Sequence, residues 1–175
     1  YFIDIDQAYN LKIENNDFFN NSGNIFMITR SILNITNNKF ENSTCFYDFG
    51  CIFNIKSYST IDFFGNTFRN IISIKEGGIY YFEFSTIFIE NETIINVMSE
   101  NYGACMFSEN SFIDIKNLEA NLYIKGCLFL SNSSTKIQNS IFLTKFIELP
   151  QSNECLSTLC FIKCFNVSIF NSTFI

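Results

Sequence analysis

The stretch from Leu33 to Asn42 reads LNITNNKFEN, and its spacing of apolar residues and asparagines returns along the chain. The shared pattern is apolar, any, apolar, any, Asn or Gly, any, any, apolar, any, Asn. Alternating apolar residues favour short strands, and repetition with variable gaps is typical of a solenoid whose coils keep a core and vary their loops. The other copies are LKIENNDFFN from Leu11, IDFFGNTFRN from Ile61, IFIENETIIN from Ile87, LYIKGCLFLS from Leu122 and the shorter VSIFNSTFI from Val167.

The fifth position of the pattern holds only Asn or Gly. Both residues tolerate the left-handed backbone region, so we predict a sharp bend with positive φ at each copy. Stacked bends can also join their Asn side chains into a hydrogen-bonded ladder. The predicted bend column is Asn15, Asn37, Gly65, Asn91, Gly126 and Asn171.

The eighth position is apolar and almost always phenylalanine. Stacked coils would place these side chains above one another, and burial of each ring would stabilise the core by roughly 1.5 to 3 kcal/mol. The second position is mixed and suits an outward face. The predicted core stack is Phe18, Phe40, Phe68, Ile94, Phe129 and Phe174.

A second recurring element places Gly or Asn two residues before a strand-like run, as in GNIFMI from Gly23, GGIYYF from Gly77 and NSIFLT from Asn139. Two or three short strands per coil follow. Residues 1–175 then form a single all-β solenoid of about six coils, with variable loops near 112–120 and 149–164. We interpret the chain as a segment of a longer protein.

The composition agrees with this fold and excludes several functions. Among the 175 residues are 27 Ile, 23 Phe and 24 Asn, which favour strands and turns. The net charge is -6 and there is no run of Lys or Arg, so nucleic acid is not an expected partner. The chain has no histidine, which removes His-based acid–base, nucleophile and metal chemistry. No apolar run is long enough to predict a membrane span in this segment.

The FFGN stretch from Phe63 and the GGIYYF stretch from Gly77 resemble repeats of the right-handed parallel β-helix in the pectin-lyase-like superfamily. They are similar to repeats of polymorphic outer-membrane-type adhesins and of repeat-bearing surface proteins of ciliated protists. A leucine-rich repeat is the alternative, because Leu33-x-Ile35-x-x-Asn38-x-Phe40 also matches its spacing. Helices between the strands would favour that alternative.

Cysteines and glycosylation sequons both suggest an extracellular location. Cys45 with Cys51, and two of Cys155, Cys160 and Cys164, are the disulfide candidates, whereas Cys105 and Cys127 suit a buried apolar role. We expect sugar on Asn34 and Asn132 before Asn91, because an inward ladder would hide Asn91. The full set of sequons is Asn34, Asn132, Asn20, Asn42, Asn166, Asn91 and Asn171.

The resemblance implies that an enzyme acting on acidic polysaccharides must be weighed, with Asp4, Asp6, Asp62 and Asp114 as the best carboxylates. None has an acidic partner in the matching column of the next coil, so we predict no catalytic, cofactor or metal site. Exposed rings that would stack on sugars are Tyr80, Tyr81, Phe88 and Tyr123.

The leading hypothesis is therefore a non-catalytic structural or adhesive segment of an extracellular surface or filament glycoprotein. Its expected partners are copies of itself or other surface proteins, through end-to-end or lateral assembly, and carbohydrate. A polysaccharide lyase or hydrolase, with its site in loops or outside this segment, is the alternative.

Overall fold

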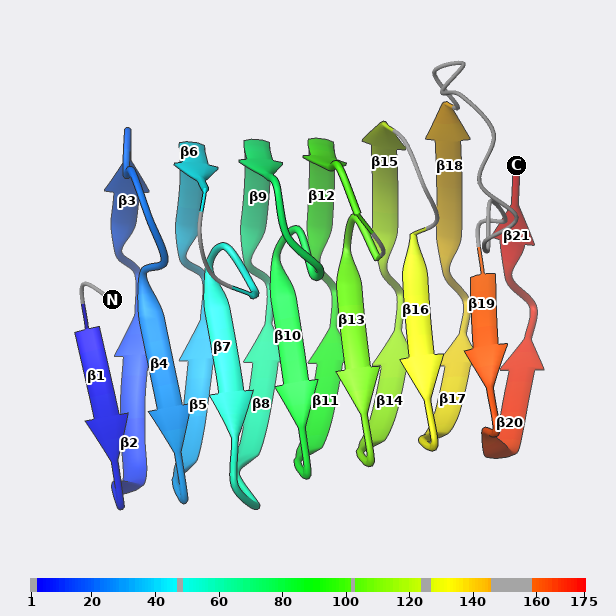
Figure 1. Cartoon of the computed structure of the whole chain (residues 1–175), viewed down its shortest axis with the longest axis horizontal. Coiled ribbons are helices and arrows are strands. Elements are labelled where there is room, and N and C mark those ends of the chain that lie inside the picture. The colour runs from blue at the N-terminus through cyan, green and yellow to red at the C-terminus, as the bar shows by residue number, and fades with distance from the viewer. Residues whose placement is uncertain (1–2, 47–48, 102, 124–126, 146–158) are drawn as a thin grey trace.

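The computed structural model describes residues 3–46, 49–101, 103–123, 127–145 and 159–175, and in them the chain is a parallel β-solenoid (Figure 1). Each coil passes through three sheets in turn, and every strand pairs in parallel with the equivalent strands of the neighbouring coils. The described residues contain no helix, which leaves the leucine-rich-repeat alternative without its connecting helices.

Sheets A, B and C each contain seven strands, one more level than the predicted six coils. Sheet A consists of β1 (Ile3–Asp6), β4 (Phe26–Thr29), β7 (Phe53–Lys56), β10 (Tyr80–Glu83), β13 (Met106–Glu109), β16 (Leu128–Ser131) and β19 (Leu159–Ile162). Sheet B consists of β2 (Tyr9–Glu14), β5 (Ile32–Thr36), β8 (Thr60–Phe64), β11 (Thr86–Glu90), β14 (Phe112–Lys116), β17 (Ser134–Gln138) and β20 (Phe165–Phe170). Sheet C consists of β3 (Asp17–Phe19), β6 (Lys39–Cys45), β9 (Thr67–Ser73), β12 (Thr93–Ser99), β15 (Glu119–Tyr123), β18 (Ile141–Lys145) and β21 (Thr173–Phe174).

The ten-residue pattern spans sheet B, a corner and sheet C, but one predicted copy was wrong. Ile87 pairs with Ile113, which in turn pairs with Thr135, so coils begin there and not at Leu122. The coil from Ile113 does not match the pattern well. Its sixth position holds Leu118, where most other copies have a polar residue, and its eighth position holds Ala120, where they have a large apolar residue. For the same reason the predicted loop near 112–120 is wrong, since β14 and β15 occupy it.

Phenylalanine rings stack in register along sheet C, as the eighth column predicts. The ring centroids of Phe18 and Phe40 are 4.8 Å apart, and those of Phe40 and Phe68 are 5.0 Å apart. Ile94 continues the column beside Phe68. At the far end the ring of Phe174 stacks at 4.9 Å on that of Phe142.

Phe129 does not belong to this stack. It lies in β16 of sheet A, half-buried, with its ring 4.8 Å from that of Phe107. The neighbours Leu128 and Leu130 are the fully buried residues of that strand, because successive side chains of a strand face opposite sides. The stack position is instead taken by Ala120, which pairs with Ile94.

The corner between sheets B and C has the predicted left-handed bends. The φ angles are 57° at Asn15, 54° at Asn37, 67° at Gly65, 56° at Asn91 and 46° at Asn171. Gly126 lies outside the described residues, and the bends of the two unrecognised coils fall at Asn117 (φ 51°) and Asn139 (φ 50°). Asn139 lies two residues before a strand, as predicted, but that strand is β18 of sheet C, so Asn139 belongs to this corner.

The buried amide ladder occupies the sixth column, one residue after the bends. Asn38 Oδ1 accepts hydrogen bonds from the backbone nitrogen and Nδ2 of Asn16, at 3.0 and 3.2 Å. Asn66 Oδ1 accepts from the same two groups of Asn38, at 2.9 and 3.1 Å. The bend asparagines themselves are exposed, because their side chains point out of the corner; Asn117 Nδ2 donates to Asn91 Oδ1 at 2.9 Å on the surface.

Glu92 replaces asparagine in the next coil and is a buried carboxyl group. Asn66 Nδ2 donates to Glu92 Oε1 at 2.7 Å, and the Tyr80 hydroxyl donates to Glu92 Oε2. Burial raises the pKa of Glu92 to about 8. Tyr80 belongs to the column of stacked rings in sheet A, with its ring centroid 5.7 Å from that of Phe53. Its hydroxyl group is therefore placed inside the core, where it provides a hydrogen-bond partner for Glu92.

Candidate functional site

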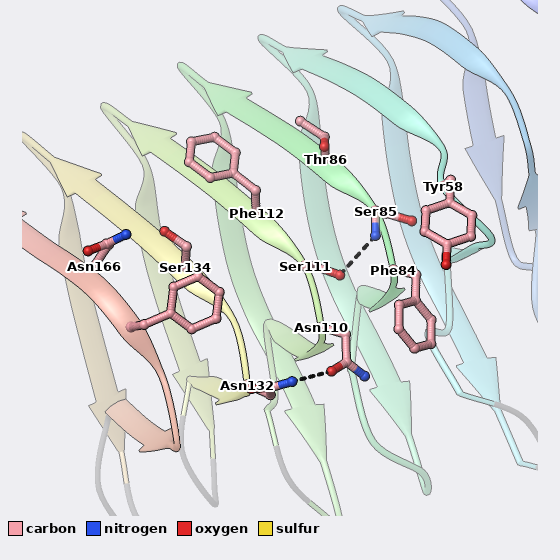
Figure 2. Close-up of a pocket in the computed structure, with 11 residues that line it drawn as sticks. Tyr58, Phe84, Ser85, Thr86, Asn110, Ser111, Phe112, Asn132, Ser134 and Asn166 are labelled. Atoms are coloured by element: carbon pink, nitrogen blue, oxygen red, sulfur yellow. Dashed lines mark hydrogen bonds between the residues drawn. The ribbon is translucent and has the colours of Figure 1, made fainter.

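A groove of about 670 Å³ runs across the coils at the corner between sheets A and B (Figure 2). Its lining combines aromatic rings, side-chain amides and hydroxyl groups. The lining residues are Tyr58, Phe84, Ser85, Thr86, Asn110, Ser111, Phe112, Asn132, Ser134, Phe165 and Asn166.

The local backbone explains why these residue types gather there. Each coil turns from sheet A to sheet B through a residue with positive φ, for example Phe84 (49°), Asn110 (50°) and Asn132 (48°). In five coils the residue after the bend is a buried serine, and the next residue is the first of the outward row of sheet B. The bend residue, the serine and the first residue of the sheet B strand therefore recur along the groove at the strand spacing of about 4.8 Å.

Serines fix this corner from inside. Ser111 Oγ accepts from the backbone nitrogen of Ser85 at 3.1 Å and donates to the carbonyl of Glu109 at 2.7 Å. Ser133 makes the same pair of bonds one coil further, with the backbone nitrogen of Ser111 and the carbonyl of Ser131. The corner backbone is thus held in place before any ligand binds.

The outer surface of the groove carries the rings. Tyr58 is 81% exposed, and its ring centroid lies 5.8 Å from that of Phe84. Phe112 is 40% exposed and Phe165 is 54% exposed, and Ser134 lies between them in the register of sheet B. These rings offer flat apolar faces to a ligand rather than filling the core.

Amides provide the polar part of the groove. Asn132 Nδ2 donates to Asn110 Oδ1 at 2.5 Å, as the dashed line in Figure 2 shows. Within the described residues that line the groove there is no Asp, Glu, Lys or Arg. The groove is chemically suited to a neutral ligand with both apolar faces and hydroxyl groups.

The rings singled out from the sequence lie elsewhere. Tyr80 is fully buried and Tyr81 is 8% exposed, because both belong to β10 and are covered on their two sides, so the prediction of exposure was wrong for them. Phe88 is exposed as predicted but does not line the groove; its ring lies 6.1 Å from that of Phe112. The side chain of Tyr123 lies outside the described part of the chain.

Sequence reasoning missed the groove because its rings do not share one column. Tyr58 and Phe84 sit at bends, whereas Phe112 and Phe165 begin strands of sheet B. A usable signal was present where each strand of sheet B begins. In several coils the two residues before the strand are an aromatic or Asn and then Ser, and the first strand residue is aromatic or carries a hydroxyl group.

The predicted carboxylates stand apart from the groove. Asp6 forms an ion pair with Arg30, whose hydrogen bond lowers the pKa of Asp6. In sheet B, Phe88 separates Asp62 from Asp114, since it pairs with both. Lys116 lies 3.7 Å from the Asp114 carboxylate.

Cys45 and Cys51 form a disulfide, with their Cα atoms 5.4 Å apart. Cys160 is also disulfide-bonded, Cys164 is a free thiol, and Cys155 lies outside the described residues. Cys105 and Cys127 are free and buried, in line with the apolar role expected of them. Burial, together with the hydrogen bond that the protonated Cys127 thiol makes with Cys105, raises the pKa of Cys127.

Sequon exposure differs from the expectation. Asn34 is half-buried, and its amide nitrogen, oriented to satisfy both neighbours, donates to the Leu33 carbonyl at 3.2 Å and to Asp62 Oδ2 at 3.3 Å. Asn91 is exposed, because the buried ladder runs one column later. The structure therefore gives no reason to expect glycosylation of Asn34 before that of Asn91. The exposed sequon asparagines are Asn20, Asn42, Asn91, Asn132, Asn166 and Asn171.

No family model, no curated protein and no solved structure matches this chain. Over the described ranges, no group of His, Cys, Asp and Glu is placed to hold a metal ion. Nor does that part of the chain contain a helix able to cross a membrane.

Proposed function

We propose that this protein is a non-catalytic structural or adhesive segment of an extracellular surface or filament glycoprotein, and that its groove binds a neutral carbohydrate chain. The observation that carries the proposal is the composition of the groove, in which rings, amides and hydroxyls repeat from coil to coil without an ionisable carboxylate or cation among the described lining residues.

Carbohydrate fits this lining better than a peptide or an anion. A sugar ring has one apolar face of C–H groups, which packs on an aromatic face, and hydroxyls at its edge that exchange hydrogen bonds with amides and serines. From the coil of Tyr58 to that of Asn166 the groove crosses four strand spacings, roughly 19 Å, which accommodates several linked sugars.

The same lining supports binding without bond cleavage. Glycoside hydrolysis uses two facing carboxyl groups, and elimination needs a base beside the sugar. The polysaccharide lyase or hydrolase alternative would place such groups in other parts of the parent protein. Its signature would be new reducing ends or unsaturated products from polygalacturonate.

Location, assembly and kinship belong to the same proposal. The Cys45–Cys51 disulfide and the exposed sequons suit an oxidising, glycosylating route to the cell surface. The parallel solenoid supports the kinship with the right-handed pectin-lyase-like β-helix and adhesin repeats. End-to-end or lateral assembly with copies of itself or with other surface proteins is part of the same proposal.

Calorimetric titration of the protein, made without glycans, with soluble laminarin, xylan and galactomannan tests the proposal. We expect at least one to bind, and Tyr58→Ala and Phe112→Ala each to weaken it by about tenfold, the loss of one stacking contact of about 1.4 kcal/mol. Phe64→Ala is the control, because Phe64 is 44% exposed on the same sheet but outside the groove.

Binding to none of the three, equal loss in the control variant, or new chain ends from any polysaccharide would each contradict the proposal.

A further inference from the structure

Two of the seven sequons begin at asparagines that line the groove. Asn132 starts Asn132-Ser133-Ser134, and Asn166 starts Asn166-Val167-Ser168. Both side chains are exposed. The other five sequon asparagines are absent from the described lining, so a glycan on Asn132 or Asn166 has a relation to the groove that the others lack.

Asn132 is the more central of the two. Ser134, two residues further on, lies between Phe112 and Phe165 in the register of sheet B, and Figure 2 shows Asn132 and Asn110 on the same side of the groove. The first sugar attached to Asn132 would therefore start beside the rings that we propose as the platform for an external chain.

The hydrogen bond of Asn132 is compatible with modification. Its Nδ2 carries two protons and donates one bond, to Asn110 Oδ1. In N-glycosylation Nδ2 loses one proton and bonds to the anomeric carbon of an oligosaccharide, whose lipid diphosphate carrier leaves. The remaining N–H can keep the bond to Asn110, so the corner need not rearrange.

We propose that the chain carries its own occupant for the groove: an N-linked glycan on Asn132 lies along the rings toward Tyr58 and excludes external carbohydrate. The proposal rests on the proposed function for its consequence, the control of binding, but not for its geometry. Glycosylation at this site then decides whether a given copy of the protein is adhesive.

The glycan reaches Tyr58 across three strand levels, since the A–B bends run from Tyr58 through Phe84 and Asn110 to Asn132. Tyr58 is 81% exposed in the bare chain and can report contact with the glycan. Tyr9 is a matched reference, because it is 69% exposed on sheet B and outside the groove.

The test uses the same chain made in a glycosylating eukaryotic host and in a bacterial host. Glycopeptide mass spectrometry establishes occupancy, and tetranitromethane nitration measures access to the two tyrosines. We expect sugar on Asn132, nitration of Tyr58 slowed severalfold with Tyr9 unchanged, and binding of laminarin, xylan or galactomannan weakened at least tenfold relative to the bare chain. In Asn132→Gln, which keeps an amide for Asn110, nitration of Tyr58 and polysaccharide binding should no longer differ between the two hosts. In Asn42→Gln the difference between hosts should persist.

An unoccupied Asn132 beside occupied sequons elsewhere, or occupancy with unchanged Tyr58 nitration, overturns this inference and leaves the proposed function standing. If the bare chain binds none of the polysaccharides while Asn132 glycosylation still protects Tyr58, the proposed function fails and the groove is a cradle for the attached glycan alone.

Discussion

At the corner between sheets B and C an inward asparagine follows each bend in the first three coils, whereas at the corner between sheets A and B the inward residue is a serine in five coils. Both residues satisfy a backbone nitrogen of the preceding coil. The asparagine also reaches back to a strand carbonyl there, as Asn66 Nδ2 does with the Ile35 carbonyl at 2.8 Å. The serine donates within its own turn, to the carbonyl two or three residues back.

The asparagine therefore bonds to two backbone groups of the preceding coil, whereas the serine bonds to one. Asn38 and Asn66 are 0% and 1% exposed. Loss of either side chain would leave buried backbone groups of the preceding coil without a hydrogen-bond partner. At the serine corner the outward positions carry the exposed rings that line the groove.

The largest effect is expected just inside the amide corner. Phe40→Asn removes a fully buried ring that stacks between those of Phe18 and Phe68, and it places an unpartnered amide in the core. We expect the free energy of unfolding to fall by about 3 to 5 kcal/mol. Urea unfolding followed by circular dichroism measures it; an unchanged midpoint would contradict the stacked core.

Asn66→Ala tests the ladder itself. The change removes the partner of three buried groups: the backbone nitrogen of Asn38, the carbonyl of Ile35 and Oε1 of Glu92. We expect a loss of at least about 3 kcal/mol in the same urea experiment, since each unsatisfied group costs about 1 to 3 kcal/mol. Asn70→Gly is the control, since Asn70 makes a comparable amide bond to Asn42 on the surface and glycine tolerates its positive φ of 54°; it should cost about 0.5 kcal/mol.

Glu92 makes the amide corner sensitive to pH. Its pKa is raised to about 8 in the folded protein, from an ordinary value of 4.5. Between these values the unfolded chain releases the proton while the folded chain keeps it, so stability falls as pH rises through this window and levels off above it. Glu92→Gln removes the titration, and the variant should gain stability relative to wild type as pH rises from 5 to 8.

Melting temperatures of both proteins across that range, with the exposed Glu100→Gln as control, measure the effect. A constant difference between Glu92→Gln and wild type would show that the carboxyl is ionised in the folded state.

The smallest effect belongs to the serine corner. Ser111→Ala removes one acceptor for the Ser85 backbone nitrogen and one local donor, and we expect about 1 kcal/mol of destabilisation by urea unfolding. If Ser111→Ala proved as costly as Asn66→Ala, the two corners would not differ in the way the hydrogen bonds indicate.

The sequence was sufficient for the architecture because the repeat expresses two strong local constraints. Only Asn and Gly fill the bend column, where φ is positive at Asn15, Asn37 and Gly65. Large apolar residues three positions later predict a stacked core, and Phe18, Phe40 and Phe68 form it. The repeat failed at Phe129 because a strand of sheet A shows the same alternation as the pattern in sheets B and C.

Only the tertiary structure decided which side of each bend is buried and where a binding surface arises. The buried ladder runs through Asn38 and Asn66, because the left-handed turn rotates the bend side chain outward and the following one inward. The bend asparagines bond to one another only at the surface, as Asn117 does with Asn91. The groove depends on register between coils separated by 22 to 28 residues in the sequence, as the bonds to Ser59, Ser111 and Ser133 show. Side-chain neighbours across coils follow from strand pairing, which a linear pattern with variable gaps leaves open.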